Sequence, residues 1–151
     1  MFAVIRIRGS IKVQKKINDA LEIIRLHRVN HMVLIDEKSR KMIERGKDYI
    51  TFGEIDEGVL AKVLEKWGRL PGRKRLDAEF LKEKGFKDFA EMANAIIEGK
   101  KKIKDLEIKP VFRLHPPRKG FERKGIKKSY SIGGVLGYRG KEINKLILKM
   151  I

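Results

Sequence analysis

The amino-acid sequence predicts an α+β protein, with a β-α-β-α-β core followed by a helical subdomain and a basic C-terminal extension. Short runs rich in Val and Ile alternate with helical repeats of apolar residues over residues 1–55. Residues 56–108 contain helical apolar stripes, and residues 109–151 contain a large excess of Lys and Arg. These three patterns divide the 151 residues into three parts, with boundaries after residues 55 and 108.

The first part of the chain predicts the core. Three short runs, at 2–7, 31–36 and 48–54, are rich in Val, Ile and aromatic residues and have the composition of β-strands. The segment 12–26 predicts a helix, because its apolar residues share one face at helical spacing: Val13, Ile17, Ala20, Leu21 and Ile24. The segment 39–47 fits a short helix or turn. We expect the two helices to cover one face of a small sheet.

The middle part predicts three helices, each with an apolar stripe and a recognisable start and stop. The expected N-terminal caps are Asp56, Asp77 and Asp88. Glycines mark the expected ends, at Gly68, Gly85 and Gly99. The first stripe contains Leu60, Val63, Leu64 and Trp67, and the third contains Phe89, Met92, Ala93, Ile96 and Ile97. The only tryptophan of the chain is therefore expected on a core-facing stripe.

The last part predicts a strand at 109–114 and a final helix at 141–151. Between them, RLHPPRKGFERKG (113–125) is expected to form an extended loop, because residues before prolines are biased toward β or polyproline conformations. The run 129–140 is rich in glycine and predicts irregular structure. The final helix is amphipathic and would bring the loop back to the body of the protein.

Charge is the strongest functional signal in the chain. Thirty-seven Lys and Arg face twenty Asp and Glu, and a protein with this net charge of +17 favours polyanionic partners. Residues 109–151 contain twelve basic and two acidic residues, whereas residues 56–108 are nearly balanced. Because binding to phosphates releases counterions, we predict that the segment 109–128 folds against nucleic acid; the alternative is a solvated basic tail. His115 and Phe121 are expected to stack on unpaired bases.

The sequence contains no motif for catalysis, metal binding or membrane insertion. It has no cysteine, which excludes disulfides and thiolate metal sites. His27 and His31 are four residues apart, but they fall at a helix-to-strand junction and lack a third ligand. The run GGVLGYRGKE departs from a phosphate-binding Walker loop, because Val135 stands where glycine is needed and Glu142 where Ser or Thr is needed. No apolar run is long enough to span a membrane, and we expect no enzyme activity, cofactor or metal.

Five stretches of the chain, in this order and spacing, resemble a known family. They are FAVIRIRG at the start, HRVNHMVLIDE (27–37), KDYITFGEID (47–56), VFRLHPPRKGF (111–121) and GGVLGYRGKEINKLILKM (133–150). The chain resembles the large-subunit ribosomal protein family L thirty, in its long archaeal form, the counterpart of L seven in eukaryotes. The resemblance covers essentially the whole chain, whereas the short bacterial form would match about the first 55 residues.

This resemblance implies a fold, a function and partners. The implied fold is a ferredoxin-like β-α-β-α-β core with a three-stranded antiparallel sheet and an added subdomain. The implied function is that of a structural component of the large ribosomal subunit, located on the cytoplasmic ribosome. The implied partners are large-subunit ribosomal RNA and neighbouring ribosomal proteins, with no membrane and no small-molecule substrate.

The resemblance also points to residues that bind RNA. It implies contacts from a segment that matches the archaeal pattern closely, at Arg113, His115, Arg118 and Lys119. An Arg-Gly-Met of the family falls on Arg40, Lys41 and Met42, so that lysine replaces the glycine and adds charge. The full predicted RNA-binding set is Arg8, Arg28, His31, Arg40, Lys41, Arg45, Lys47, Arg113, His115, Arg118, Lys119, Arg123, Lys124, Lys127, Lys128 and Arg139.

Two other functions remain open at this point. A basic DNA-binding or chromatin protein would need a recognition helix suited to the major groove. The helix predicted at 12–26 is not a clean candidate, because its outer face mixes cations with the acid Glu22. An RNA-processing enzyme or its accessory subunit would need a cluster of acids or histidines, which the sequence does not supply.

Overall fold

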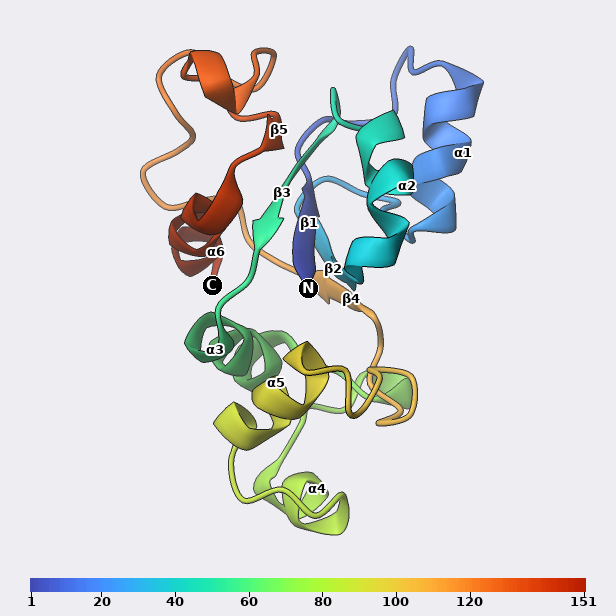
Figure 1. Ribbon diagram of the computed structural model, residues 1–151, viewed down its shortest axis with the longest axis vertical. Helices are drawn as coiled ribbons and strands as arrows, with labels where there is room; N and C mark the ends of the chain where they lie inside the picture. The colour runs from blue at the N-terminus through green and yellow to red at the C-terminus, as the bar shows by residue number, and fades with distance from the viewer.

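The structure, a computed structural model, describes the backbone of residues 1–151 and the side chains of all residues except Arg73. The protein is an α+β fold (Figure 1). Its first part has the predicted order of elements: β1 (Phe2–Arg6), α1 (Lys15–Ile23), β2 (His31–Ile35), η1 (Glu37–Ser39), α2 (Arg40–Arg45) and β3 (Ile50–Glu54). Helix α1 is shorter than predicted, because Lys12 and Arg25 on either side of it adopt left-handed backbone angles, with φ of 57° and 63°.

The sheet has five strands, in the order β4-β2-β1-β3-β5. Strand β4 (Val111–Arg113) pairs antiparallel with β2, and β5 (Gly137–Tyr138) pairs parallel with β3. The prediction of a three-stranded antiparallel sheet was therefore wrong, because it counted only the strands of the core. The C-terminal extension covers both edges of that core, where unpaired backbone groups would otherwise be exposed.

Both faces of the sheet are covered. All five residues of β1 are buried, and the four apolar ones alternate between two apolar clusters. Phe2 and Val4 join the cluster that α1 and α2 form on one face, as expected for the two core helices. Ala3 and Ile5 join the larger cluster on the opposite face, which also contains buried residues of α3, α5 and α6. The extension and the middle helices therefore share one core with the sheet.

Three of the remaining helices begin where the sequence predicts, and the last begins two residues later than predicted, after a 3-10 turn. They are α3 (Glu57–Trp67), α4 (Ala78–Glu83), α5 (Phe89–Ile97) and α6 (Ile143–Met150), with short 3-10 turns η2 (Pro71–Arg73), η3 (Tyr130–Ile132) and η4 (Gly140–Glu142). The first three follow Asp56, Asp77 and Asp88, whose backbones are extended, although none of these carboxylates makes a side-chain cap hydrogen bond. Figure 1 places α4 at the end of the molecule farthest from the sheet.

A buried asparagine fixes α6 against the sheet. The Asn144 amide donates to the carbonyl of Glu54 at 3.0 Å and to that of Lys141 at 2.9 Å. Its Oδ1 accepts from the backbone N–H of Asp56 at 3.0 Å. Asn144 thereby links the end of β3 and the start of α3 to the final helix, which positions the basic extension on the body.

Candidate nucleic-acid interface

The loop part of the basic segment 109–128, called the basic loop, is attached to the body by backbone hydrogen bonds at its start. The N–H of Leu114 donates to Asn30 O at 3.1 Å, and the N–H groups of His115 and Arg118 donate to carbonyls of α6 at 3.0 and 2.9 Å. Leu114 and Pro117 are buried. The loop therefore buries more than its sequence suggests, and it presents its cations outward.

Phe121 is predicted to stack on a base, and the structure places it partly inside the protein. Its side chain is half-buried and packs against the large core cluster, which leaves only part of the ring exposed for stacking. His115 is exposed, and its ring lies nearly perpendicular to that of Trp67, with the ring centroids 4.7 Å apart. Its ring already contacts an aromatic neighbour in the protein.

Most of the predicted RNA-binding cations lie on the surface. Arg8 and His31 are half-buried, and Arg139 is buried. The exposed members are Arg28, Arg40, Lys41, Arg45, Lys47, Arg113, His115, Arg118, Lys119, Arg123, Lys124, Lys127 and Lys128. Lys41 lies within helix α2, in place of the family's glycine. Its backbone angle φ is not positive, so lysine is accommodated at this position without a left-handed backbone.

Arg139 is a structural residue. Its Nη1 donates to Glu122 Oε1 at 2.8 Å, its Nε to Thr51 Oγ1 at 2.9 Å and its Nη2 to Val135 O at 3.0 Å. Its guanidinium also lies 4.5 Å from the ring centroid of Tyr130. The side chain is only 2% exposed. Arg139 therefore ties the extension to β3, and its buried side chain does not belong to the exposed cationic surface, in contrast to its predicted role in binding RNA.

The ion pair with Arg139 favours the ionised form of Glu122. Burial raises the pKa of the Glu122 carboxyl. The hydrogen bond and charge of Arg139, together with a backbone hydrogen bond and the charge of Lys149, lower the pKa by more than burial raises it. The pKa therefore lies below the ordinary glutamate value of 4.5. Glu122 is the one acid within the basic segment 109–128. Since it pairs with Arg139, which lies outside this segment, the eight cations of the segment have no free acid within it.

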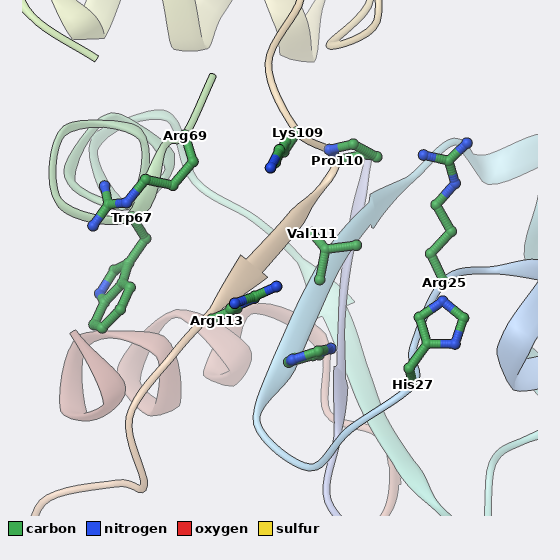
Figure 2. A pocket seen from close by; sticks show the side chains of 9 residues that line it. Arg25, His27, Trp67, Arg69, Lys109, Pro110, Val111 and Arg113 are labelled. Atoms are coloured by element: carbon green, nitrogen blue, oxygen red, sulfur yellow. The ribbon is translucent and has the colours of Figure 1, made fainter. Parts of the chain in front are cut away.

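A cavity lies beside β4, and we call it the β4 cavity (Figure 2). Its volume is about 550 Å³. Strands β2 and β4 place His31 opposite Arg113, and Figure 2 shows Trp67 and Arg69 on one side and Arg25 on the other. The nine lining residues are Arg25, His27, His31, Trp67, Arg69, Lys109, Pro110, Val111 and Arg113. None of them is acidic.

The β4 cavity is strongly cationic. Arg25, Lys109 and Arg113 have no ion pair with any side chain that the structure describes. Arg69 donates to the carbonyls of Lys66 and Gly68, at 3.1 and 2.7 Å, and so keeps its charge unpaired. Four cations without an acidic partner around one cavity give it a positive potential, which favours anions.

The surroundings of His31 lower the pKa of its side chain. Burial lowers the pKa of its imidazole most, and the charges of Arg113, His27, Arg28 and Arg6 lower it further. Its Nδ1 is buried without a hydrogen-bond partner among the described residues. The imidazole is thus neutral at physiological pH, and the positive charge of the cavity comes from arginine and lysine.

A second cavity joins predicted cations from distant parts of the chain. It has a volume of about 610 Å³ beside β5, and its lining includes Arg8, Lys47 and Lys127. The Arg8 guanidinium lies 4.6 Å from the ring centroid of Tyr49 and donates to Asp48 O at 3.1 Å. This cavity extends the cationic surface from the core to the basic loop.

Only part of the β4 cavity is predicted from the sequence. Trp67 packs against the core cluster, as expected from its apolar stripe, but it is half-buried and also lines the cavity. Arg25 and Arg69 had no predicted role, and Lys109 had one only as a member of the basic segment 109–128. The pairing of β4 with β2 brings these residues together, and this pairing has no local sequence signal. Among the described residues, no group of His, Cys, Asp or Glu is placed to hold a metal, and no helix is long and apolar enough to cross a membrane.

Comparison with known proteins gives one matching family model and several relatives that match along the whole chain. A family model described as ribosomal protein L30p/L7e matches residues 2–50. Three archaeal proteins named large ribosomal subunit protein uL30 match along their whole length. The Nanoarchaeum equitans protein is 52% identical over 153 residues, covering 100% of this chain and 99% of its own. That of Methanococcus maripaludis is 53% identical over 152 residues, covering 99% of each chain.

The third relative, from Methanobrevibacter smithii, is 46% identical over 154 residues and covers 100% of both chains. The family model alone matches the core, but these relatives also match the middle helices and the basic extension. Similarity at about half of all positions, from the first strand to the last helix, shows that the chain belongs to the ribosomal protein L30p/L7e family.

Proposed function

We propose that this protein is a structural component of the large ribosomal subunit that binds ribosomal RNA through contacts between its Lys and Arg side chains and phosphates. The observation that carries the proposal is the cation-rich extension, with twelve basic and two acidic residues, attached to the core by β4 and α6. Membership of a ribosomal protein family supports the same function and argues against an enzyme. Its partners are then ribosomal RNA and neighbouring ribosomal proteins on the cytoplasmic ribosome.

The proposed mechanism is electrostatic anchoring. Side chains that reach phosphates position the protein on RNA without reading its bases. We infer that residues 1–55 form the scaffold, residues 56–108 support it, and residues 109–151 supply most of the RNA contacts. The exposed cations of the predicted set form the interface, together with Arg8 and His31 at its half-buried edge.

Sedimentation tests the assignment to the ribosome. The protein is isolated from its own cells at moderate salt, and the fractions are separated by size. We expect it to migrate with the large ribosomal subunit. Co-purification with chromosomal DNA instead would overturn the proposal in favour of a chromatin protein.

A salt titration tests the basic loop. We expect the combined variant Arg118→Gln, Lys119→Gln, Arg123→Gln and Lys124→Gln to flatten the slope of log affinity against log salt by about three to four units. The reason is that each lost phosphate contact releases about one counterion fewer. The measurement is binding of purified large-subunit ribosomal RNA between low and moderate salt.

The matched control removes four exposed lysines from the middle part, at Lys62, Lys74, Lys82 and Lys87. It makes the same change in net charge, so it separates local contacts from the overall field of the protein. An equal flattening in both variants would contradict the assignment to the loop. Truncation is a poorer test, because β4 and the buried residues of α6 belong to the shared core.

A further inference from the structure

We propose that the β4 cavity holds one unpaired nucleotide of an RNA strand, with the base against Trp67 and the flanking phosphates on the surrounding cations. This inference rests on the proposed function and adds a second kind of contact to it. The rest of the interface binds phosphates on an open surface, whereas the cavity encloses part of its ligand.

The lining of the cavity has both kinds of chemistry that a nucleotide needs. Trp67 packs in part against the core and against His115, and the part of its side chain that lines the cavity supplies aromatic surface for a base, with apolar surface from Pro110 and Val111. Arg25, Arg69, Lys109 and Arg113 supply charge for phosphates. Its volume of about 550 Å³ suits a single ligand of this size. Side chains from α3, the α1–β2 turn and β4 surround it, so the base would be enclosed from more than one side (Figure 2).

The cavity favours an unpaired strand over a duplex. Bases in a duplex are stacked and paired, so they offer only their edges and backbone to a protein. An unpaired base can leave the stack and present its face to an aromatic side chain. Arg28 is exposed in the α1–β2 turn next to His27. It can receive a neighbouring phosphate of the same strand.

Two residues that line the cavity have a ring nitrogen without a hydrogen-bond partner. Trp67 Nε1 and His31 Nδ1 are buried and have no partner among the described residues. Unsatisfied buried groups are uncommon in proteins, and two of the five among the described residues belong to side chains that line this cavity, where a bound nucleotide would offer hydrogen-bonding partners.

The experiment uses the full chain and its single tryptophan as a reporter. Fluorescence of Trp67 is followed while a single-stranded adenine hexanucleotide, a short RNA duplex or adenosine monophosphate is added. Binding of each RNA is measured in parallel by anisotropy of a label on the RNA. We expect saturable quenching by the hexanucleotide, binding of the duplex without quenching, and weaker binding of the monophosphate.

Two variants keep the reporter and change the cavity. Arg113→Gln and Arg69→Gln are each expected to weaken hexanucleotide binding about tenfold. Each should also lower the salt slope for this single strand by about 0.7. Lys82→Gln on α4, at the far end of the molecule, is the matched control and should change neither value (Figure 1). Unfolding curves verify that all three variants are folded.

The outcomes separate this inference from the proposed function. Duplex binding without any quenching by the hexanucleotide overturns the nucleotide site and leaves the ribosomal function standing. Equal quenching by duplex and single strand also overturns it. Monophosphate binding as tight as that of the hexanucleotide would assign the cavity to a free nucleotide instead. If neither RNA binds, both the inference and the proposed RNA-binding function fail.

Discussion

Gly53→Ala is expected to destabilise the protein by about 3 kcal/mol, at the upper end of the usual cost of overpacking a core. Gly53 lies in β3, where the backbone of Gly140 crosses it closely. A Cβ atom at Gly53 would overlap the Gly140 carbonyl oxygen and come within 2.9 Å of its carbonyl carbon and 3.1 Å of Ile143 Cβ. These are mostly backbone atoms, so a side-chain rotation cannot make room. Urea unfolding at neutral pH measures the loss.

Gly58→Ala is the matched control for this substitution. Gly58 is exposed in α3, and a Cβ there would meet nothing within 4 Å. Glycine costs about 0.5–1 kcal/mol relative to alanine inside a helix, and Gly58 lies in the first turn of α3, so this variant should be stabilised by at most about that amount. If Gly53→Ala unfolds within about 0.5 kcal/mol of the original protein, the close approach of η4 to β3 is not as described.

The predictions that succeeded depend on local patterns. The strands at the start of the chain and helices α3 and α5 each bury residues at a fixed spacing, so their positions can be read from the sequence alone. Strand β5 could not be found in this way, since it has two residues within a glycine-rich run and pairs with β3 far away in the chain. The glycine within β3 was the available signal, because an isolated strand glycine often marks a close backbone approach.

The sequence predicts which cations are exposed where charge alone decides, and fails where a pairing in the fold buries the side chain. An excess of cations in the extension is visible in composition, and most of those side chains are exposed. Arg139 looks the same in sequence, but Glu122, seventeen residues away, pairs with it in the fold. Arg6 also ends a strand as an apparent surface charge, yet it is 1% exposed and donates to Leu26 O. Only tertiary structure separates such structural arginines from those free to meet RNA.

Glu122→Gln is expected to destabilise the protein by about 2 kcal/mol, because it leaves the buried guanidinium of Arg139 without a counter-ion. Breaking a buried ion pair usually costs about 3–5 kcal/mol, but the Glu122 side chain is 29% exposed and water can compensate in part. Arg139 also keeps its bonds to Thr51 and Val135. The measurement is urea unfolding at neutral pH.

The matched control is Glu44→Gln, which removes the acid from another Arg–Glu pair. Arg40 and Glu44 are joined at 3.2 Å, but both side chains are more than half exposed, at 53% and 54%. Such a surface pair contributes little, so the control should lose no more than about 0.5 kcal/mol. Equal losses in the two variants would show that burial does not strengthen the Arg139 pair.

The pH dependence provides an independent test of the same pair. The pKa of Glu122 in the folded protein lies below 4.5, because the effect of Arg139 outweighs that of burial. The ionised carboxylate therefore stabilises the folded state at pH values above the pKa of the unfolded chain. That contribution is lost as pH falls through the lower, folded-state pKa. The stability difference between the original protein and Glu122→Gln should therefore be constant near neutrality and shrink below about pH 4.5. A difference that stays the same down to strongly acidic pH would mean that the loss comes from packing, and that the charge of Glu122 does not hold Arg139 in place.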